Sequence, residues 1–85
     1  MILKFSRQAE KSYRKLSLII QKKADKQFEY LLSDYRHPSL RTRKMGEGDK
    51  FEGRIDFHYR FTFTVDGEDI WVLTIGMHDE GLGKK

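Results

Sequence analysis

The side chains best suited to chemistry occupy one long alternating stretch, residues 51 to 66, and the strand end that follows it. Arg54, His58 and Arg60 share the even positions of this stretch, and His78 comes later in the chain. Guanidinium groups bind a phosphate through paired N–H donors and stabilise the charge that develops on it. A histidine exchanges a proton near neutrality because its unperturbed pKa is about 6.5. Together these residue types indicate a site that binds an anion and transfers a proton.

Each of these residues also has a purely structural interpretation. The two arginines could form cross-strand salt bridges to Glu52 or Asp56 on a solvated face. His78 could be a surface histidine that caps a strand, although Asp79 directly after it could orient the ring for acid–base chemistry. The histidines show no ligand spacing such as HxxxH, and no phosphate-binding glycine loop or nucleophile elbow is present. No metal and no cofactor are therefore expected.

A second set of cations lies just before the alternating stretch, within nine residues that contain no acid. Its members are Arg36, Arg41, Arg43 and Lys44. The whole chain has 17 Lys+Arg against 13 Asp+Glu, a net charge of +4. A basic balance is typical of a protein with an anionic partner, such as nucleic acid or an acidic protein, although the same charges could serve solubility alone.

The alternating stretch predicts the hairpin that positions the two arginines. A β-strand points successive side chains to opposite faces, so the odd positions form an apolar face and the even positions a polar one. Sixteen residues is too long for one ordinary strand, so a bend lies inside. Pairing Ile55 with Tyr59 keeps the odd positions on the core and sets Arg54 opposite Arg60. Facing cations repel, and an anion between them would relieve the repulsion.

A second hairpin is expected at residues 66–69, followed by a nearly all-apolar interior strand at 70–77. A two- or four-residue loop would turn the even-numbered residues of that strand toward the core. A three-residue loop would turn the odd-numbered residues toward it. We favour three, because this buries the larger side chains and exposes Thr74 beside Arg60 and His78. The large side chains assigned to the core on this basis, together with the other buried aromatics, are Trp71, Leu73, Ile75, Met77, Phe28, Phe61 and Phe63.

The rest of the chain supplies a first strand at 2–5, two helices and an edge strand at 40–45. Ser6 and Ser17 are candidate N-caps, and the second helix should end near Asp34, before Pro38. The order β-α-α-β-β-β-β predicts one α+β domain over residues 1–85. In it an antiparallel sheet of four to five strands carries both helices on one face. There is no cysteine, no secretory signal and no apolar run of about 18 residues, so a soluble cytoplasmic protein without a membrane partner is expected.

Over nearly its whole length the sequence resembles the RelE/ParE superfamily of bacterial toxins from toxin–antitoxin systems. The segments that carry the resemblance are KFSRQAEKSYRKL, HPSLRTRKM and FEGRIDFHYRFTFTVDGEDIWVLTIGMHDE. The most specific pieces are Tyr59-Arg60-Phe61 and the sequence from Gly76 to Glu80. The resemblance implies a metal-independent endoribonuclease that cleaves mRNA, usually in the ribosomal A site, by attack of a ribose 2′-hydroxyl on the adjacent phosphate.

The resemblance also assigns roles to single residues. Arg60 matches the arginine of the family's "YR" strand, Arg54 a basic position on the preceding strand, and His78 the basic or histidine position after the last strand's glycine. Asp79 follows as in histidine-bearing members, and His58 is the competing candidate for proton transfer. The family's C-terminal aromatic, which stacks on a base, has no counterpart in the tail from residue 80 to 85, so Tyr59 could take that role.

The partners implied by the resemblance are a cognate antitoxin, mRNA and the ribosome, and operator DNA for the toxin–antitoxin complex. Arg36, Arg41, Arg43 and Lys44 are then expected to contact RNA backbone. Two alternatives remain open. One is a ParE-like inhibitor of DNA gyrase without catalysis, and the other is a degenerate member that binds its antitoxin but cleaves nothing. Retention of Arg54, Arg60 and His78 favours the nuclease.

Overall fold

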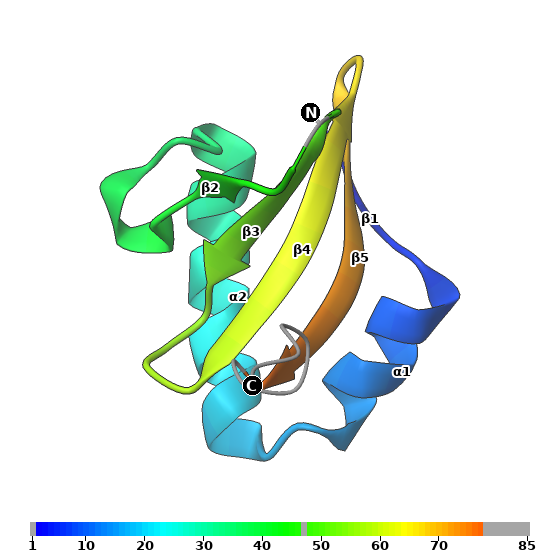
Figure 1. Cartoon of the computed structure of the whole chain (residues 1–85). Coiled ribbons are helices and arrows are strands. Elements are labelled where there is room, and N and C mark those ends of the chain that lie inside the picture. Colours follow the sequence, from blue (N-terminus) through cyan, green and yellow to red (C-terminus); the bar gives the residue numbers. More distant parts are fainter. Residues whose placement is uncertain (1, 47, 78–85) are drawn as a thin grey trace.

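A computed structural model describes residues 2–46 and 48–77, which form two helices against a five-stranded sheet (Figure 1). The elements in chain order are β1 (Ile2–Phe5), α1 (Arg7–Lys15), α2 (Leu18–Ser33), the 3₁₀ helix η1 (Pro38–Leu40), β2 (Arg43–Lys44), β3 (Lys50–Arg54), β4 (Tyr59–Asp66) and β5 (Asp69–Met77). The strand order is β1-β5-β4-β3-β2. β1 runs parallel to β5 and the other pairs are antiparallel, so the predicted α+β fold and element order are confirmed and the sheet is mixed.

Both predicted helix starts are confirmed. The Ser6 hydroxyl accepts the amide of Ala9 at 3.0 Å, and the Ser17 hydroxyl accepts the amide of Ile20 at 3.3 Å. These contacts satisfy amide groups that have no partner inside the first turn. Ser6 also donates its hydroxyl to the Leu73 carbonyl at 2.7 Å, which fixes the start of α1 to β5.

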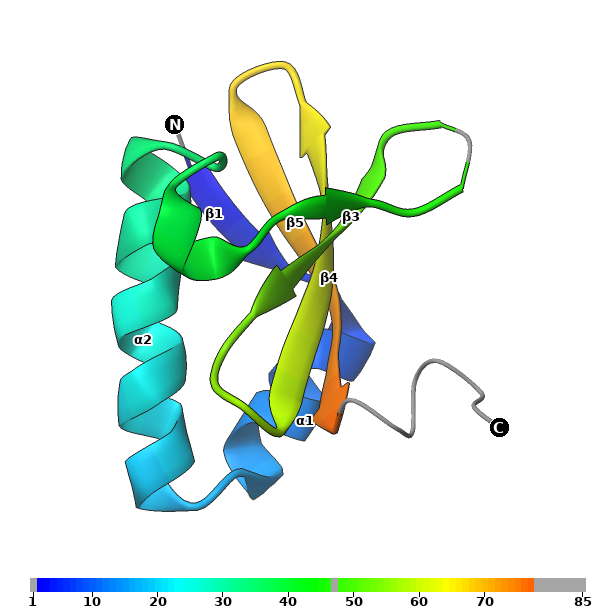
Figure 2. The ribbon, with the colours of Figure 1, turned by 60° about the vertical axis from the view of Figure 1, so that its left-hand side comes forward.

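The helices and the sheet share one hydrophobic core. Figure 2 shows α2 running alongside the sheet, and the Phe28 ring on α2 meets the Phe61 ring on β4 edge to face at 5.1 Å. Opposite Phe61 stands Gly53, where a Cβ would lie 2.5 Å from the Phe61 ring, so only glycine leaves room for it. The buried apolar side chains are Ala9, Ala24, Phe28, Leu31, Leu40, Ile55, Phe61, Phe63, Ile70, Val72 and Ile75.

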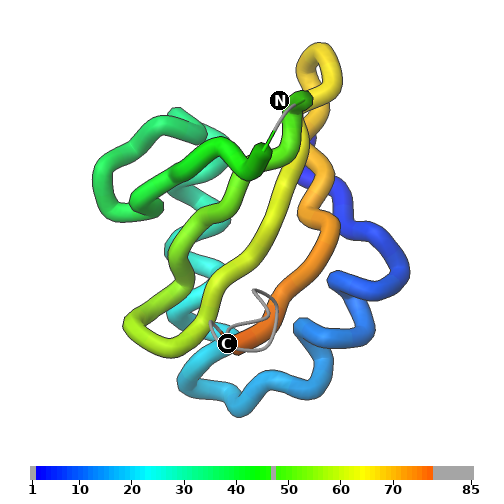
Figure 3. The backbone as a smooth tube through the Cα atoms, viewed as in Figure 1, coloured from blue at the N-terminus to red at the C-terminus, as the bar shows by residue number. Residues whose placement is uncertain are grey.

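The first hairpin has the predicted register. The Ile55 amide donates to the Tyr59 carbonyl at 3.0 Å, and Arg54 stands opposite Arg60. The β3–β4 and β4–β5 hairpins lie at opposite ends of β4, as the backbone tube in Figure 3 shows. One odd position departs from the expected apolar face. Phe57, at the tip of the loop, is 72% exposed because the chain reverses there and no strand covers the ring.

The second hairpin differs from the prediction. Asp66 pairs with Asp69, so the loop has two residues, and Gly67 takes the positive φ of 62° that such a turn uses. This loop places Ile70 and Val72 in the core and leaves Trp71 opposite Thr64 on the polar face. The assignment of Trp71 to the core is therefore wrong, and so is that of Leu73, which is half-buried outside the core cluster.

Further along β5 a β-bulge reverses the alternation, so that the odd-numbered residues face the core there, as predicted. The register shifts so that Thr62 pairs with Thr74, and their hydroxyls hydrogen-bond at 2.7 Å. Ile75 is consequently buried and Thr74 lies on the polar face, both as predicted. Met77 was also expected in the core, but it is 42% exposed at the end of the strand.

The segment from 40 to 45 is less extended than predicted. Pro38 begins η1, whose last residue Leu40 is fully buried, and Arg41 follows in the left-handed region with φ 49°. Only β2 is a strand, at the edge of the sheet. Proline at the first position of a helix lacks only an amide that would be unpaired anyway, which explains a turn where an edge strand was expected. Of the helices between residues 2 and 77, none is long and apolar enough to cross a membrane.

Candidate functional site

The loop between β3 and β4 is built around the side chain of Asp56. Its Oδ1 accepts the amides of His58 and Tyr59, both at 2.9 Å, and its Oδ2 lies 3.4 Å from Lys23 Nζ on α2. Burial by itself would raise the pKa of the Asp56 carboxyl, but the two amides and the Lys23 ammonium together hold that pKa below its usual value. The carboxylate therefore fixes the loop and anchors it to α2.

This loop also gathers the two predicted arginines. The carbonyl oxygen of Asp56 accepts Arg60 Nη1 at 2.7 Å and Arg54 Nε at 3.3 Å, and Arg60 further donates to the Phe57 carbonyl at 3.3 Å. Both side chains are half-buried. The backbone of one tight loop thus holds two guanidinium groups beside each other, as the predicted cross-strand pairing requires.

The predicted salt-bridge alternatives for these arginines are not what the structure contains. Glu52 is buried and bonds Arg43 Nη2 at 3.1 Å instead, and the Asp56 carboxylate bonds Lys23. Within residues 2–46 and 48–77, no carboxylate oxygen lies within 4.0 Å of a guanidinium nitrogen of Arg54 or Arg60. Two adjacent guanidinium groups that form no salt bridge within these segments are chemically suited to binding an anion.

Part of the basic run lies near Arg54. Arg41 and Arg54 line one hollow of about 640 Å³, together with Gln27 and His37. A neighbouring hollow of about 370 Å³ shares Arg41 with the first, and Arg36 and Lys44 also line it. The structure therefore places Arg41 and Arg54 on one hollow, which Arg60 does not line. Arg43, the fourth member of the run, instead bonds Glu52 on β3.

The three histidines separate into different settings. His58 is exposed in the loop, two residues from Arg60, with its ring edge to face against Phe57. His37 stacks on Tyr30 at 4.0 Å, and its Nδ1 accepts the Ser39 amide at 3.2 Å, so it caps η1. His78 and Asp79 lie outside the described residues, and their predicted roles stay predictions. Nowhere in the described segments do three His, Cys, Asp or Glu side chains gather as a metal site would need.

Phe57 is a candidate that the sequence reasoning missed. Its exposed ring lies beside the site, 6.0 Å from the guanidinium carbon of Arg54. Tyr59, the residue expected to replace the missing C-terminal aromatic, is instead half-buried against the core. Because Asp56 and His58 are polar loop formers on either side of Phe57, an exposed loop tip could have been read from the sequence at that position.

Asp56 should therefore control the stability of the loop in a pH-dependent way. Asp56→Ala should lower the free energy of unfolding at pH 7 by about 1–3 kcal/mol, because two amides and an ammonium lose a charged acceptor. Since the folded pKa lies below the unfolded value, this stabilisation is present above pH ~4 and fades as the pH falls through the folded pKa. Urea unfolding at several pH values measures it, with the exposed Asp49→Ala as control. A loss as large at pH 3 as at pH 7 would contradict the assignment.

Comparisons with known proteins identify the fold. No protein-family model matches this chain, and no curated protein matches its sequence. Among solved structures, the isolated E. coli RelE toxin superposes with a TM-score of 0.77 at 21% identity, covering 96% of this chain and 88% of that one. A chain of the RelE–RelB complex from Pyrococcus horikoshii superposes with a TM-score of 0.78 at 17% identity, covering 94% of this chain and 97% of that one. The YoeB dimer from Staphylococcus aureus gives a TM-score of 0.71 at 21% identity, covering 92% of this chain and 97% of that one. The resemblance inferred from the sequence is confirmed at the level of the fold.

Proposed function

We propose that this chain, which has the fold of the RelE and YoeB toxins, is the toxin of a toxin–antitoxin pair and cleaves mRNA on the ribosome without a metal ion. The observation that carries the proposal is the pair Arg54 and Arg60, held on one loop carbonyl and, in the described segments, without a salt bridge to any carboxylate. Such a pair suits the negative charge of a phosphate at which a bond is being exchanged.

In the proposed reaction, a ribose 2′-oxygen forms a bond to the adjacent phosphorus while the bond to the 5′-oxygen breaks. The products are a 2′,3′-cyclic phosphate and a 5′-hydroxyl. One proton leaves the 2′-hydroxyl and another reaches the 5′-oxygen. Arginines stay protonated and can only stabilise charge, whereas an unperturbed histidine titrates near neutrality. We therefore assign one of the two proton transfers to His78, with Asp79 orienting it, and the other to water. His58 is the competitor, because it lies in the same loop as the arginine pair.

The two hollows that Arg41 lines, one of them shared with Arg54, suggest the course of the RNA. A strand whose scissile phosphate lies between Arg54 and Arg60 would continue over the hollow that Arg41 lines, toward Arg36 and Lys44. Phosphate contacts of this kind position the strand and carry no sequence information. The exposed Phe57 ring offers a stacking surface for a base at the same site, the role that no residue of the tail can fill.

Arg41 should then contribute to the salt dependence of binding. We expect Arg41→Gln to reduce the slope of log affinity for programmed ribosomes against log salt concentration by about 1, because one phosphate contact is lost. Arg7→Gln, an exposed arginine on α1, is the matched control and should leave the slope unchanged. Equal slopes for wild type and Arg41→Gln would leave Arg41 as an ordinary solvated charge.

The proposed reaction has a chemical signature. Purified chain added to programmed ribosomes in EDTA should yield mRNA fragments that end in a 2′,3′-cyclic phosphate and begin with a 5′-hydroxyl. Intact mRNA together with inhibited supercoiling by DNA gyrase would instead assign the chain to the ParE-like alternative. Intact mRNA and active gyrase would assign it to the degenerate alternative.

The proposal includes an antitoxin that covers the arginine pair with an acidic or amphipathic segment that orders on binding. Solved structures with this fold include complexes named for an antitoxin, such as E. coli RelBE and S. aureus YoeB–YefM. We place the activity in the cytoplasm, where mRNA and ribosomes are found, and operator DNA would be bound by the toxin–antitoxin complex.

A further inference from the structure

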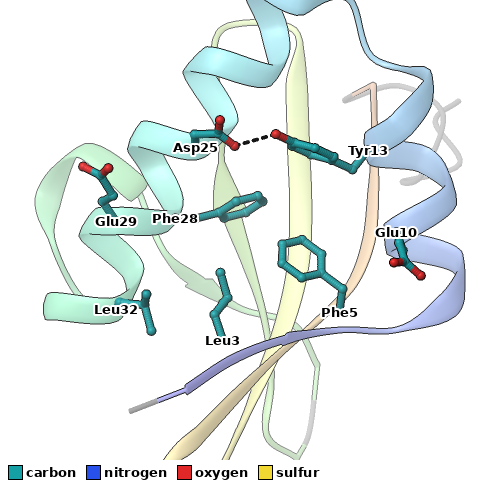
Figure 4. Close-up of a pocket in the computed structure, with 8 residues that line it drawn as sticks. All are labelled: Leu3, Phe5, Glu10, Tyr13, Asp25, Phe28, Glu29 and Leu32. Atoms are coloured by element: carbon teal, nitrogen blue, oxygen red, sulfur yellow. Dashed lines mark hydrogen bonds between the residues drawn. The ribbon is translucent and has the colours of Figure 1, made fainter.

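A groove of about 470 Å³ lies between β1, α1 and α2, away from the arginine pair (Figure 4). Its apolar lining includes Phe5, Phe28 and Leu32, and Phe5 packs edge to face on Phe28 at 5.4 Å. Tyr13 donates its hydroxyl to Asp25 at 2.7 Å, a contact that joins the two helices across the groove. The groove is therefore an apolar surface that the protein's own helices leave partly uncovered.

The charged residues lining this groove are all acids. They are Glu10, Asp25 and Glu29, and each is exposed. Glu10 forms a salt bridge with Arg14, one turn further along α1, at 3.3 Å between Oε2 and Nη2. No Lys or Arg nitrogen lies within 4.0 Å of the Glu29 carboxylate in the part of the chain that the structure describes. A protein of net charge +4 thus presents an acidic rim around an apolar floor.

The position of the groove separates it from the arginine pair. It borders β1, one of the two edge strands of the sheet, whereas Arg54 and Arg60 lie on β3 and β4. A segment seated in it would not need to touch the anion site. An acidic segment that covered the arginines would be repelled here, so the two surfaces select partners of opposite charge.

From this chemistry we infer that the groove docks a segment of a separate protein chain that carries apolar side chains next to lysines or arginines. The apolar side chains pack on the groove floor formed by Phe5, Phe28 and Leu32, and the cations meet Glu29 and Asp25 at the rim. Apolar burial supplies the affinity, and the rim charges select a basic partner over an acidic one. This docking does not depend on nuclease activity.

The test compares two defined helical peptides of 14 residues, each with leucines on one face and either lysines or glutamates on the other. Fluorescence anisotropy with the full chain should show the lysine peptide binding about 10-fold more tightly than the glutamate peptide. Net charge alone predicts the opposite order for a protein of +4. In NMR spectra, adding the lysine peptide should change the amide chemical shifts of Phe28 and Leu32 and leave that of Arg60 unchanged.

Matched charge reversals locate the binding. Glu29→Lys should weaken the lysine peptide about 10-fold, whereas Asp49→Lys, at an exposed turn before β3, should change its affinity less than 2-fold. Equal weakening by both variants, or preference for the glutamate peptide, would overturn the inference. Concentration-dependent dimerisation that Glu29→Lys abolishes would also overturn it, since the groove would then belong to a second copy of this chain.

Discussion

Replacing Arg60 with alanine should abolish toxicity and slow mRNA cleavage about 100- to 1000-fold, the range for loss of one group that stabilises a transition-state charge. The Arg60 guanidinium lies beside that of Arg54, and both donate to the Asp56 carbonyl. Removing one guanidinium leaves a phosphate with half of its charge stabilisation. The fold should stay intact, because Arg60 is not part of the hydrophobic core.

The control for Arg60→Ala is a variant with the same change of charge elsewhere. Arg7→Ala, on the exposed surface of α1, should retain full toxicity. Arg60→Lys should retain part of the cleavage rate, since an ammonium keeps the charge but loses the two-pronged geometry. Circular dichroism and thermal unfolding establish that each variant is folded. A folded Arg60→Ala protein with full toxicity would place the site elsewhere.

The second large effect is expected at His78. His78→Ala should lower the single-turnover cleavage rate by about 100-fold or more, the range for loss of a general acid or base. His58→Ala should lower it much less, because the proposed function assigns the proton transfer to His78. The proton carrier must titrate near neutrality, and unperturbed histidine is the side chain in this chain that does so.

Single-turnover reactions on programmed ribosomes across a range of pH distinguish the two histidines. The cleavage rate of the wild type should change as the pH passes through the pKa of the catalytic histidine, because only one protonation state of the ring is active. The rate of His78→Ala should be low and should no longer change with pH in this range. His37→Ala is a further control, since His37 caps η1. A larger loss for His58→Ala than for His78→Ala would reverse the assignment.

The first hairpin was predictable because two independent constraints agree on it. The alternation of residues 51–66 shows that the odd-numbered side chains face the core. They can do so on both strands only if the loop between the strands has an odd number of residues. The pairing of Arg54 with Arg60 follows directly and is what the structure contains. Ser6 and Ser17 were equally readable, because a cap depends only on residues within one turn.

The second hairpin was not predictable in the same way. Its strand is apolar on both parities, so the pattern could not distinguish a two-residue loop from a three-residue loop. The structure has the two-residue loop, and a bulge at the register shift between Thr62 and Phe63 then changes which residues of β5 face the core. A bulge leaves no trace in alternation when both faces carry apolar residues, and Trp71 was misplaced for that reason.

The parts of the site that depend on tertiary contacts were also hidden from the sequence. Arg41 and Arg54 line the same hollow although they are 13 positions apart, because Gln27 bonds the Ser39 carbonyl of η1 and the Arg54 carbonyl of β3. Glu52 could have paired with either Arg54 or Arg43, and only the antiparallel pairing of β2 with β3 decides for Arg43. Sequence spacing alone fixes neither choice.

Primer extension on total cellular mRNA after induction of the chain tests the central proposal most directly. The proposal predicts discrete new 5′ ends at in-frame positions of translated messages within minutes of induction. These ends should be absent after induction of Arg60→Ala at an equal protein level. Growth arrest with intact mRNA, or identical cuts from wild type and Arg60→Ala, would contradict the account.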